Sequence, residues 1–298
     1  MSGLRVVKKP ESVIVQELPD GISLSVPDKG LADDVAQVSL GPGKAKLVVR
    51  AGVSSRFRLA VSFGEDTKLA QELEAEFEFF LEAGACIDVF FLSAGHQGLD
   101  KILAQSRYHL KKHASLNVWT FTGDSHARLS HELFFDEPHG FASVRGLSLL
   151  GGSSEVDHHV HADHLVGACI SRQFYKSIVA EDAKTSFDSL VSVGRGADRS
   201  DSKQLNKNLL LSKTARAVSR PELRIENDDV ACAHGSATGE IDPAQLFYLR
   251  SRGIDESSAR FMMIEGFAAE VLGEIPDIPF KEHLREWVSG RVRQLAGR

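Results

Sequence analysis

The spacing of apolar and polar residues predicts strands over most of the chain. Residues 45–64 alternate apolar and polar side chains, which is the two-residue period of a β-strand with one buried face. Residues 1–35 form short strand-like runs that are broken at 19–21 and 27–30, where proline, aspartate and glycine favour turns. Residues 68–95 are ambiguous: their first half also fits an acidic helix, whereas their second half fits two strands around a glycine turn.

Sharp corners built from small residues recur through the middle of the chain. They begin near residues 83, 112, 138, 166 and 181, and each is followed by a short alternating run. Helix signals are nearly absent between residues 85 and 230, and two-residue hairpin turns of the Asn-Gly kind are missing. Many short strands without helices between them are typical of a β-sandwich or a β-solenoid. We favour the solenoid, because stacked coils need small residues where the chain turns sharply.

After residue 240 the pattern changes to helices. Asp242 and Pro243 are a good N-cap and first helical residue, and Gly253 is a natural end for this helix. Asp255 is expected to cap a second helix that ends before Pro276, and a third helix is expected to start near Pro279. The chain is therefore divided into an N-terminal segment (1–35), a β-solenoid core (36–239) and a C-terminal helical region (240–298).

Composition and charge exclude several classes of protein. The 298 residues are 42% hydrophobic and 26% charged, with a net charge of -6, so a general nucleic-acid or membrane-surface binder is not indicated. No membrane span or signal peptide is recognised, so we expect a cytoplasmic protein. Three cysteines, Cys86, Cys169 and Cys232, lie far apart, which argues against a disulfide framework.

Three ordered segments carry a resemblance to a known family. Residues 220–254, which include "CAHGSATGEIDP", together with residues 171–193 and 199–212, resemble the SufD branch of the SufB/SufD family of iron–sulfur cluster assembly proteins. The first hundred residues match weakly, and the N-terminal region is shorter than in most relatives. The resemblance implies a right-handed parallel β-helix with a helical C-terminal region. It also implies a non-enzymatic scaffold that works with SufB and the ABC-type ATPase SufC to build and transfer nascent clusters, and it links SufD-like chains to iron acquisition.

Cys232 and His234 are the candidate metal ligands. On a strand, residues two apart face the same side, so thiolate and imidazole can converge on one ion. Iron and iron–sulfur clusters accept both ligands, but two ligands are too few for a stable site. The family's functional histidine falls on His234. We therefore expect a transient cluster shared with a partner subunit, and the isolated chain need not retain one.

Residues 157–164 offer an alternative site. Four histidines lie in this stretch, and on a strand Asp157, His159, His161 and Asp163 share one face while His158 and His164 share the other. The first set could hold zinc or iron in a metallo-enzyme, or could be a polar ladder facing solvent. A further alternative is a homomeric SufB-like scaffold that holds the cluster alone. Residues 151–155 lack the lysine and glycine spacing of a phosphate-binding loop, so nucleotide hydrolysis is expected from a partner.

The helical tail has two interpretations, which are compatible. It could cap the open end of the solenoid, or it could bind the ATPase through exposed Tyr248, Arg250 and Arg252, which are typical interface residues. Residues 199–212 are expected near an uncovered strand edge at the C-terminal end of the solenoid. An edge of this kind invites pairing, so we expect a homodimer when the chain is isolated and a heterodimer with SufB in the cell.

Overall fold

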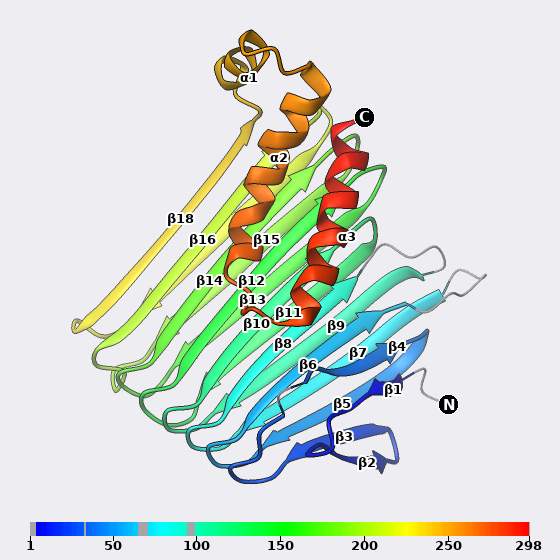
Figure 1. The fold of residues 1–298 in the computed structure, drawn as a ribbon. Coiled ribbons are helices and arrows are strands. Elements are labelled where there is room, and N and C mark those ends of the chain that lie inside the picture. Colours follow the sequence, from blue (N-terminus) through cyan, green and yellow to red (C-terminus); the bar gives the residue numbers. More distant parts are fainter. Residues whose placement is uncertain (1–3, 33, 65–70, 94–98, 298) are drawn as a thin grey trace.

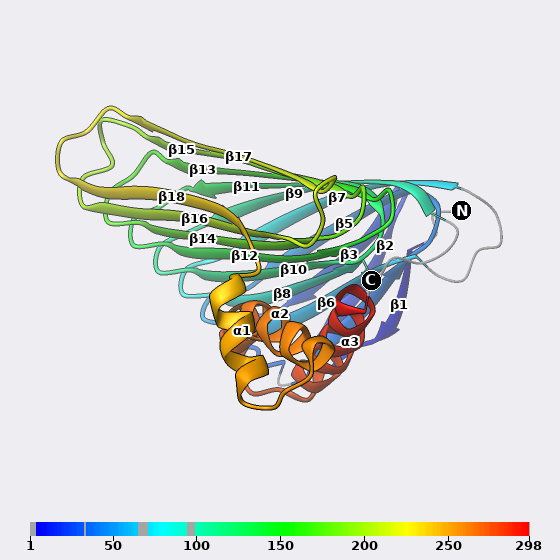
Figure 2. The ribbon, with the colours of Figure 1, turned by 90° about the horizontal axis from the view of Figure 1, so that it is seen from above.

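The protein is a flattened solenoid of β-strands with helices on one outer face (Figures 1 and 2). This computed structural model describes residues 4–32, 34–64, 71–93 and 99–297. Within those residues the chain alternates between two sheets, here called sheet A and sheet B, and each sheet contains nine strands. From β3 onward, each strand pairs in parallel with the strand of the same sheet in the next coil. The expected fold class, a parallel β-helix with a small C-terminal helical region, is confirmed.

Sheet A consists, in spatial order, of β1 (Leu4–Lys8), β4 (Ala36–Leu40), β6 (Arg56–Phe63), β8 (Cys86–Ser93), β10 (Ser115–Thr122), β12 (Phe141–Leu150), β14 (Ile170–Val179), β16 (Ser200–Leu210) and β18 (Val230–Glu240). Sheet B consists of β17 (Arg216–Ile225), β15 (Lys184–Val193), β13 (Glu155–His164), β11 (His126–Phe135), β9 (Leu99–Leu110), β7 (Gln71–Leu81), β5 (Gly43–Ala51), β3 (Gly21–Val26) and β2 (Ile14–Leu18). The strand β7 shows that the acidic-helix interpretation is wrong for residues 71–81, and residues 68–70 lie outside the described part. The domain division stays a prediction; β3, within its first segment, already pairs with β5.

The predicted corners are the turns between the two sheets. Each contains one residue with a left-handed backbone: Gly84, His113, His139, Ala168 and Glu181. A small buried residue follows each of them closely. At Gly140, for example, an added Cβ would lie 2.7 Å from the ring of Phe135, at the end of the strand that leads into the same corner. Packing therefore requires a small residue at this position.

The interior between the sheets is apolar in the first coils. The rings of Phe63 and Phe91 stack with their centroids 5.9 Å apart, and Phe77 meets Phe91 edge-on at 5.1 Å. Farther along, Gly146 leaves room for a larger neighbour, since its Cβ would lie 2.3 Å from the ring of Tyr175. Tyr175 is the register partner of Gly146 on the next strand of sheet A. The interior is thus filled by stacking large side chains over small ones.

Three histidines are also buried in this interior. His131 accepts or donates hydrogen bonds with Tyr108 and Thr120, and His158 contacts the hydroxyl of Ser148 at 2.9 Å. Burial lowers the pKa of His131 to about 3 and that of His158 to about 4. The pKa of His164 falls to about 4 for the same reason, with the nearby Arg172 as a smaller cause. All three imidazoles are therefore neutral in the folded protein at neutral pH.

Three helices follow β18: α1 (Pro243–Ser251), α2 (Glu256–Gly273) and α3 (Pro279–Ala296). The side chains of Asp242 and Asp255 accept hydrogen bonds from backbone N–H groups of the first turns of α1 and α2, which confirms both predicted caps. Helices α2 and α3 pack their apolar faces on the outer face of sheet A, where they form a second apolar cluster (Figure 2).

The position of the helices overturns the capping interpretation. Helices α2 and α3 cross the face of sheet A and leave the end of the solenoid open, where β17 and β18 are the last strands of their sheets (Figure 1). Residues 199–212 form β16, which is covered by β18, so the edge belongs to β17 and β18 rather than to this segment.

Polar contacts fix the helices to the sheet. Lys176 on β14 is fully buried beneath α2; its Nζ donates to the Phe267 carbonyl at 2.7 Å and lies 2.8 Å from a carboxylate oxygen of Glu270. Arg145 reaches Glu274 at 2.8 Å. Arg291 on α3 is also buried, and its Nε donates to the Leu149 carbonyl at 3.2 Å. Long cationic side chains therefore join residues that are far apart in the sequence.

The close approach of Tyr175 to Gly146 leads to a first prediction. We expect Gly146→Ala to reduce the free energy of unfolding by about 1–3 kcal/mol, because the added methyl group displaces the tyrosine ring. The matched control is Gly290→Ala on α3, where nothing lies within 4 Å of the new Cβ, and which should stabilise the protein by roughly 0.5–1 kcal/mol. Urea unfolding measures both. Equal stability of Gly146→Ala and the wild type would contradict the packing described.

The buried histidines lead to a second prediction, on pH. Their folded pKa values lie below the unfolded value of about 6.5, so the unfolded chain binds more protons as the pH falls through this window. Stability is complete above about pH 6.5 and decreases toward pH 4, by up to roughly 1.4 kcal/mol per pH unit for each histidine. Replacing His158 with glutamine should make this decrease less steep, whereas His283→Gln, on the exposed side of α3, should not. Urea midpoints measured across the window give the comparison.

Candidate functional site

The two predicted ligands lie on β18, the last strand of sheet A. Their register partners on β16 are Ser202 for Cys232 and Gln204 for His234, and both partners are buried between the sheets. Side chains in register on parallel strands point the same way, so Cys232 and His234 face the interior at its open end. The predicted shared face is therefore present. Cys232 is half-buried against the apolar core, and His234 is exposed.

One hydrogen bond orients the imidazole of His234. Its Nδ1 lies 3.1 Å from the backbone carbonyl oxygen of Pro221 on β17, in the opposite sheet. A carbonyl oxygen only accepts, so Nδ1 carries the proton and donates it. The other nitrogen, Nε2, then keeps its lone pair free. A histidine held in this way is able to bind a metal ion through Nε2.

The thiol of Cys232 is protonated in the resting chain. Burial raises its pKa, and the negative charge of Asp201 acts in the same direction; a backbone contact with Ser202 opposes both. A thiol binds metal as the thiolate, so a metal ion must displace this proton. Metal binding through Cys232 therefore releases a proton. Cys86 and Cys169, at the corners, also have free thiols whose pKa is raised by burial.

The two ligands do not make a closed site by themselves. Among the residues that the structure describes, no group of three or more histidine, cysteine, aspartate or glutamate side chains is arranged to hold a metal ion. Cys232 and His234 stand at a strand edge that no other part of the described chain covers. Any further ligand for an ion at this position has to come from outside those residues.

The alternative site at residues 157–164 is divided between two faces. His158 and His164 point inward and are buried, and Asp157, His159, His161 and Asp163 point outward. The outward side chains pair with neighbouring strands: His159 lies 3.6 Å from Asp188, and His161 contacts Ser192 at 3.1 Å. The polar ladder is therefore present for the outward set. The histidines and carboxylate of a metallo-enzyme do not come together here in the described residues.

The interior beside His234 is polar, which the alternation of apolar residues did not reveal. Strand β16 turns Leu205 and Leu209 outward and buries its uncharged polar side chains, which are Ser200, Ser202, Gln204, Asn206 and Asn208. The sequence did contain a signal for the direction of this strand. Its even-numbered positions from 200 to 208 are serine, glutamine or asparagine, whereas its odd-numbered positions include the charged Asp201, Lys203 and Lys207. Charged side chains are seldom fully buried, so the odd-numbered positions are expected on the outer face of the strand.

The predicted partner-binding residues lie on or just after α1, which has no buried residue. Tyr248 is 56% exposed, and its hydroxyl accepts from Arg252 at 3.1 Å while the guanidinium lies over the ring. Arg250 forms an ion pair with Glu256 at 3.2 Å. Phe247 is 73% exposed. This end of the helical region therefore presents aromatic and arginine side chains to solvent.

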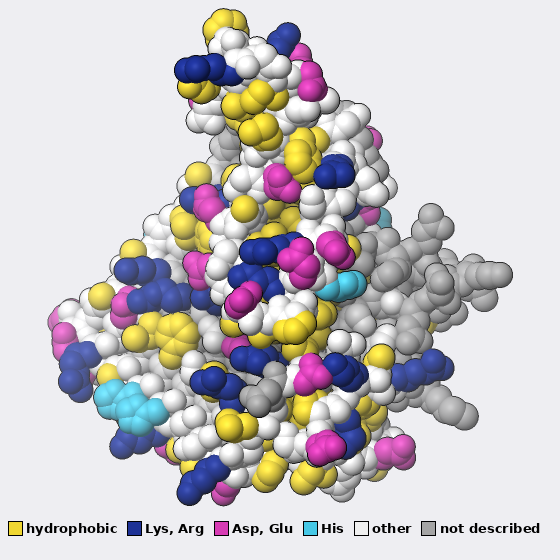
Figure 3. Space-filling view, viewed as in Figure 1, with side chains coloured by type: hydrophobic (Ala, Val, Ile, Leu, Met, Phe, Trp, Pro, Cys, Tyr) yellow, Lys and Arg dark blue, Asp and Glu magenta, His cyan; other side chains and the backbone are white. Residues whose placement is uncertain are grey.

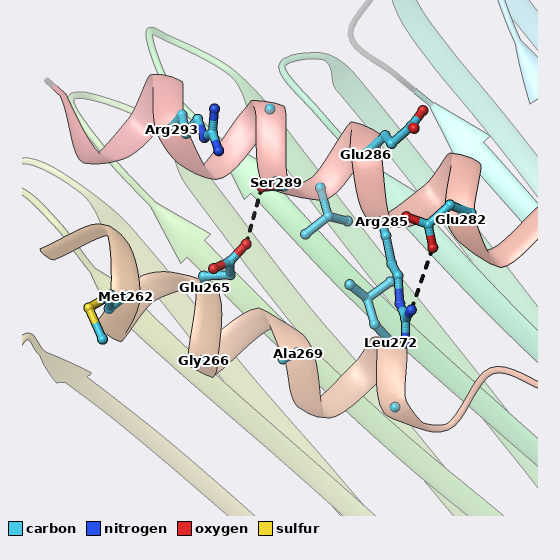
Figure 4. A pocket seen from close by; sticks show the side chains of 13 residues that line it. Met262, Glu265, Gly266, Ala269, Leu272, Glu282, Arg285, Glu286, Ser289 and Arg293 are labelled. Atoms are coloured by element: carbon cyan, nitrogen blue, oxygen red, sulfur yellow. Dashed lines mark hydrogen bonds and ion pairs between the residues drawn. The ribbon is translucent and has the colours of Figure 1, made fainter. Parts of the chain in front are cut away.

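A groove runs between α2 and α3 on their outer side (Figure 4). Its floor contains small residues, and no atom lies within 4 Å of a Cβ built at Gly266, Gly273 or Gly290. Glu265 accepts a hydrogen bond from Ser289 across the groove at 3.1 Å. Basic and acidic side chains are mixed over this face of the molecule, with apolar side chains between them (Figure 3). None of the described helices is both long enough and apolar enough to cross a membrane.

The chain is similar in sequence to known proteins. Residues 42–267 match the model of the SufBD core domain of the SUF system for iron–sulfur cluster assembly. The chain is 41% identical over 132 residues to the iron-sulfur cluster assembly protein SufD of Escherichia coli, which covers 44% of this chain and 30% of that protein. It is 34% identical over 218 residues to a SufBD family protein of Mycobacterium leprae, covering 70% of this chain and 55% of the relative.

A third relative is the iron-sulfur cluster assembly protein SufD of Bacillus subtilis, 34% identical over 116 residues, or 39% of this chain and 26% of that protein. The matches thus span between about a quarter and just over half of these relatives' lengths. The family model, by contrast, covers most of this chain and includes the strand that carries Cys232 and His234. The chain therefore belongs to the SufB/SufD family of iron–sulfur cluster assembly proteins.

Proposed function

We propose that this protein is a non-enzymatic, SufD-like scaffold subunit that helps to build nascent iron–sulfur clusters and transfer them to apoproteins. The observation that carries the proposal is the placement of Cys232 and His234 on the inner face of the last strand of an open solenoid. The cluster is the cargo of this scaffold. Thiolate and imidazole are ligands that iron accepts, and two of them leave room for ligands from elsewhere.

The missing ligands come from a partner subunit that pairs with the open end. Among the strands that the structure describes, β17 and β18 each have a neighbour on one side only, so their outer backbone groups are available to another chain. A SufB-type subunit is the proposed partner in the cell, and a second copy of this chain takes its place when the protein is isolated. In either case the partner's strands would extend both sheets and place its own ligands opposite Cys232 and His234.

The helical region is the proposed binding surface for a SufC-type ABC ATPase. The sequence has no phosphate-binding loop, so the energy of nucleotide hydrolysis has to be supplied by a partner. Exposed Phe247 and Tyr248 lie beside arginines on α1, and the groove between α2 and α3 is lined by small residues and has a charged rim. Aromatic and arginine side chains are the usual anchors of protein–protein interfaces.

Replacing His234 with alanine tests the cluster site. We expect His234→Ala to abolish iron–sulfur cluster delivery in cells that depend on this protein, because the ligand held by Pro221 is lost. The free energy of unfolding should change by less than about 0.5 kcal/mol, since the side chain is exposed and contributes little to the core. Delivery is measured as the activity of a cluster-dependent enzyme, and folding by circular dichroism and urea unfolding.

A matched control for this variant is His126→Ala, which removes an exposed histidine from sheet B far from β18. It should support normal delivery. Full delivery by His234→Ala, or unfolding of that variant, would show that His234 is not a cluster ligand. Loss of delivery by both variants would indicate a general effect on the protein and would also count against the assignment.

Changing Tyr248 and Arg250 together to alanine tests the ATPase surface. We expect the double variant to bind a SufC-type ATPase at least roughly tenfold more weakly, because interface aromatic and arginine residues often contribute more than 1.4 kcal/mol. Association with a SufB-type subunit should be unchanged, since Tyr248 and Arg250 lie on α1, beyond the end of β18, and belong to neither edge strand. Co-purification and calorimetry measure the two interactions separately. An unchanged dissociation constant for the ATPase would rule out this surface.

A further inference from the structure

A column of uncharged amides runs through the interior next to His234. In sheet A, Gln173 on β14 is in register with Gln204 on β16, and Gln204 is in register with His234 on β18. Both glutamines are 2% exposed. Ser189 on β15 lies opposite them, and Pro221, its register partner on β17, holds the imidazole of His234. The column therefore extends from the buried interior to the hydrogen bond between His234 and the Pro221 carbonyl.

The hydrogen bonds of this column join the two sheets. The Nε2 of Gln204 donates to the hydroxyl of Ser189, and that hydroxyl donates to Oε1 of Gln173. The same Nε2 lies 3.4 Å from the backbone carbonyl oxygen of Glu222, the residue after Pro221. Since that carbonyl can only accept, the orientation of the Gln204 amide is fixed. Gln204 thus stands beside His234 in sheet A and contacts the backbone beside Pro221 in sheet B.

This arrangement is not the most stable way to fill the interior. Burying amides is unfavourable unless all their groups are hydrogen-bonded. Gln204 Oε1 and Gln173 Nε2 are buried and have no partner among the described residues. Leucine side chains at these positions would fill similar space without unpaired polar atoms. The amides therefore contribute something other than stability.

The role of the buried amides can be inferred from their position directly below the last coil. Strands β17 and β18 are each supported by a strand on one side only, so the distance between the sheets at this end depends on the coil below. Gln204 and Ser189 bridge the sheets in that coil. The bond from His234 to Pro221 also crosses between the sheets, and a change in their separation would break it.

We propose that Gln204, together with Ser189, is a positioning residue that keeps the His234 imidazole bonded to the Pro221 carbonyl and thereby holds Nε2 free to bind metal. This role rests on the proposed function of His234 as a ligand. Gln204 itself does not touch the metal. Gln204 holds the two sheets at a fixed separation. This separation keeps the Pro221 carbonyl within reach of His234 Nδ1, and that hydrogen bond sets the tautomer and the direction of the imidazole.

The first test reads the tautomer of His234 in the isolated full-length chain. Long-range ¹⁵N–¹H correlation spectra of histidine-labelled protein, at an alkaline pH where imidazoles are neutral, should show the proton on Nδ1 in the wild type. The His234→Ala spectrum identifies the signal. Gln204→Leu should transfer population toward the Nε2–H tautomer, which prevails for an imidazole in water, while the urea midpoint stays equal or rises. Ser189→Ala removes the side-chain bridge to sheet B and leaves only the longer contact of Gln204 Nε2 with the Glu222 carbonyl, so it should shift the tautomer in the same direction.

The matched control is Asn208→Leu. This variant also replaces a buried amide of β16 with leucine, but the hydrogen bonds that Asn208 donates within the described part of the chain go to Asn206 and Thr238, which both belong to sheet A. The tautomer of His234 should not change in it. If Gln204→Leu fails to fold, Ser189→Ala alone decides the question. A wild-type tautomer in Ser189→Ala, or an equal change in Asn208→Leu, would overturn the positioning role.

The second test measures metal binding directly. Co²⁺ added to the isolated chain should produce thiolate-to-cobalt absorption through Cys232, and the apparent affinity should fall at least roughly tenfold in Gln204→Leu and Ser189→Ala, as for outer-shell partners of other metal sites. Asn208→Leu should bind Co²⁺ like the wild type. Unchanged affinity in both bridge variants would refute the proposal. Normal cluster delivery by His234→Ala would instead refute the ligand role, and the tautomer experiment would still report on the bridge.

Discussion

The parallel ladder between successive coils is the interaction on which the rest of the structure depends. Each strand takes its backbone partners from the strands before and after it in the same sheet, as Phe141 pairs with Ile170 and Ile170 with Asp201. A strand with neighbours on both sides can hydrogen-bond its backbone N–H and C=O groups in both directions. The strands of the last coil, β17 and β18, have such a neighbour on one side only among the described strands. The ladder that builds the solenoid therefore also leaves an unpaired end, and Cys232 and His234 lie on it.

The side chains that fill the interior differ between the first coils and the coils near the open end. Near its beginning, stacked rings such as Phe63 and Phe91 fill the space and stabilise the coils by burial. Near the open end, amides and hydroxyls replace them, and some of their polar atoms have no hydrogen-bond partner among the residues that the structure describes. Apolar side chains hold two sheets together but leave their exact spacing adjustable. Directional hydrogen bonds set that spacing, which matters most where one residue from each sheet must meet.

Strands β14 and β16 carry side chains that contact the interior on one face of sheet A and helix α2 on the other. Their inner side chains, Gln173 and Gln204, belong to the column beside His234, and their outer side chains, Lys176 and Lys207, lie within ion-pair distance of Glu270 on α2. Burial lowers the pKa of Lys176, and the nearby Glu270 carboxylate counteracts this. Removing that carboxylate would leave the buried ammonium group of Lys176 without its counter-charge. The helical region is thus tied to the same strands that support the candidate site.

The sequence by itself determined most features that depend on neighbours along the chain, although it left residues 71–81 ambiguous between helix and strand. The two-residue period gave the strands, small residues marked the corners, and Asp242 and Asp255 marked the starts of two helices. The same period placed Cys232 and His234 on one face, and the family resemblance singled them out.

Only the tertiary structure decided which face is the inside and what lies next to it. Alternation alone would bury Leu205 and Leu209 of β16, yet both point outward. Leu209 joins the apolar cluster that the helices form on sheet A, whereas Leu205 is exposed. The bond from His234 to Pro221 and the position of the helices on sheet A join residues from separate elements. Strand periodicity fixes which side chains share a face, but it contains no information about the partners that coil stacking brings against that face.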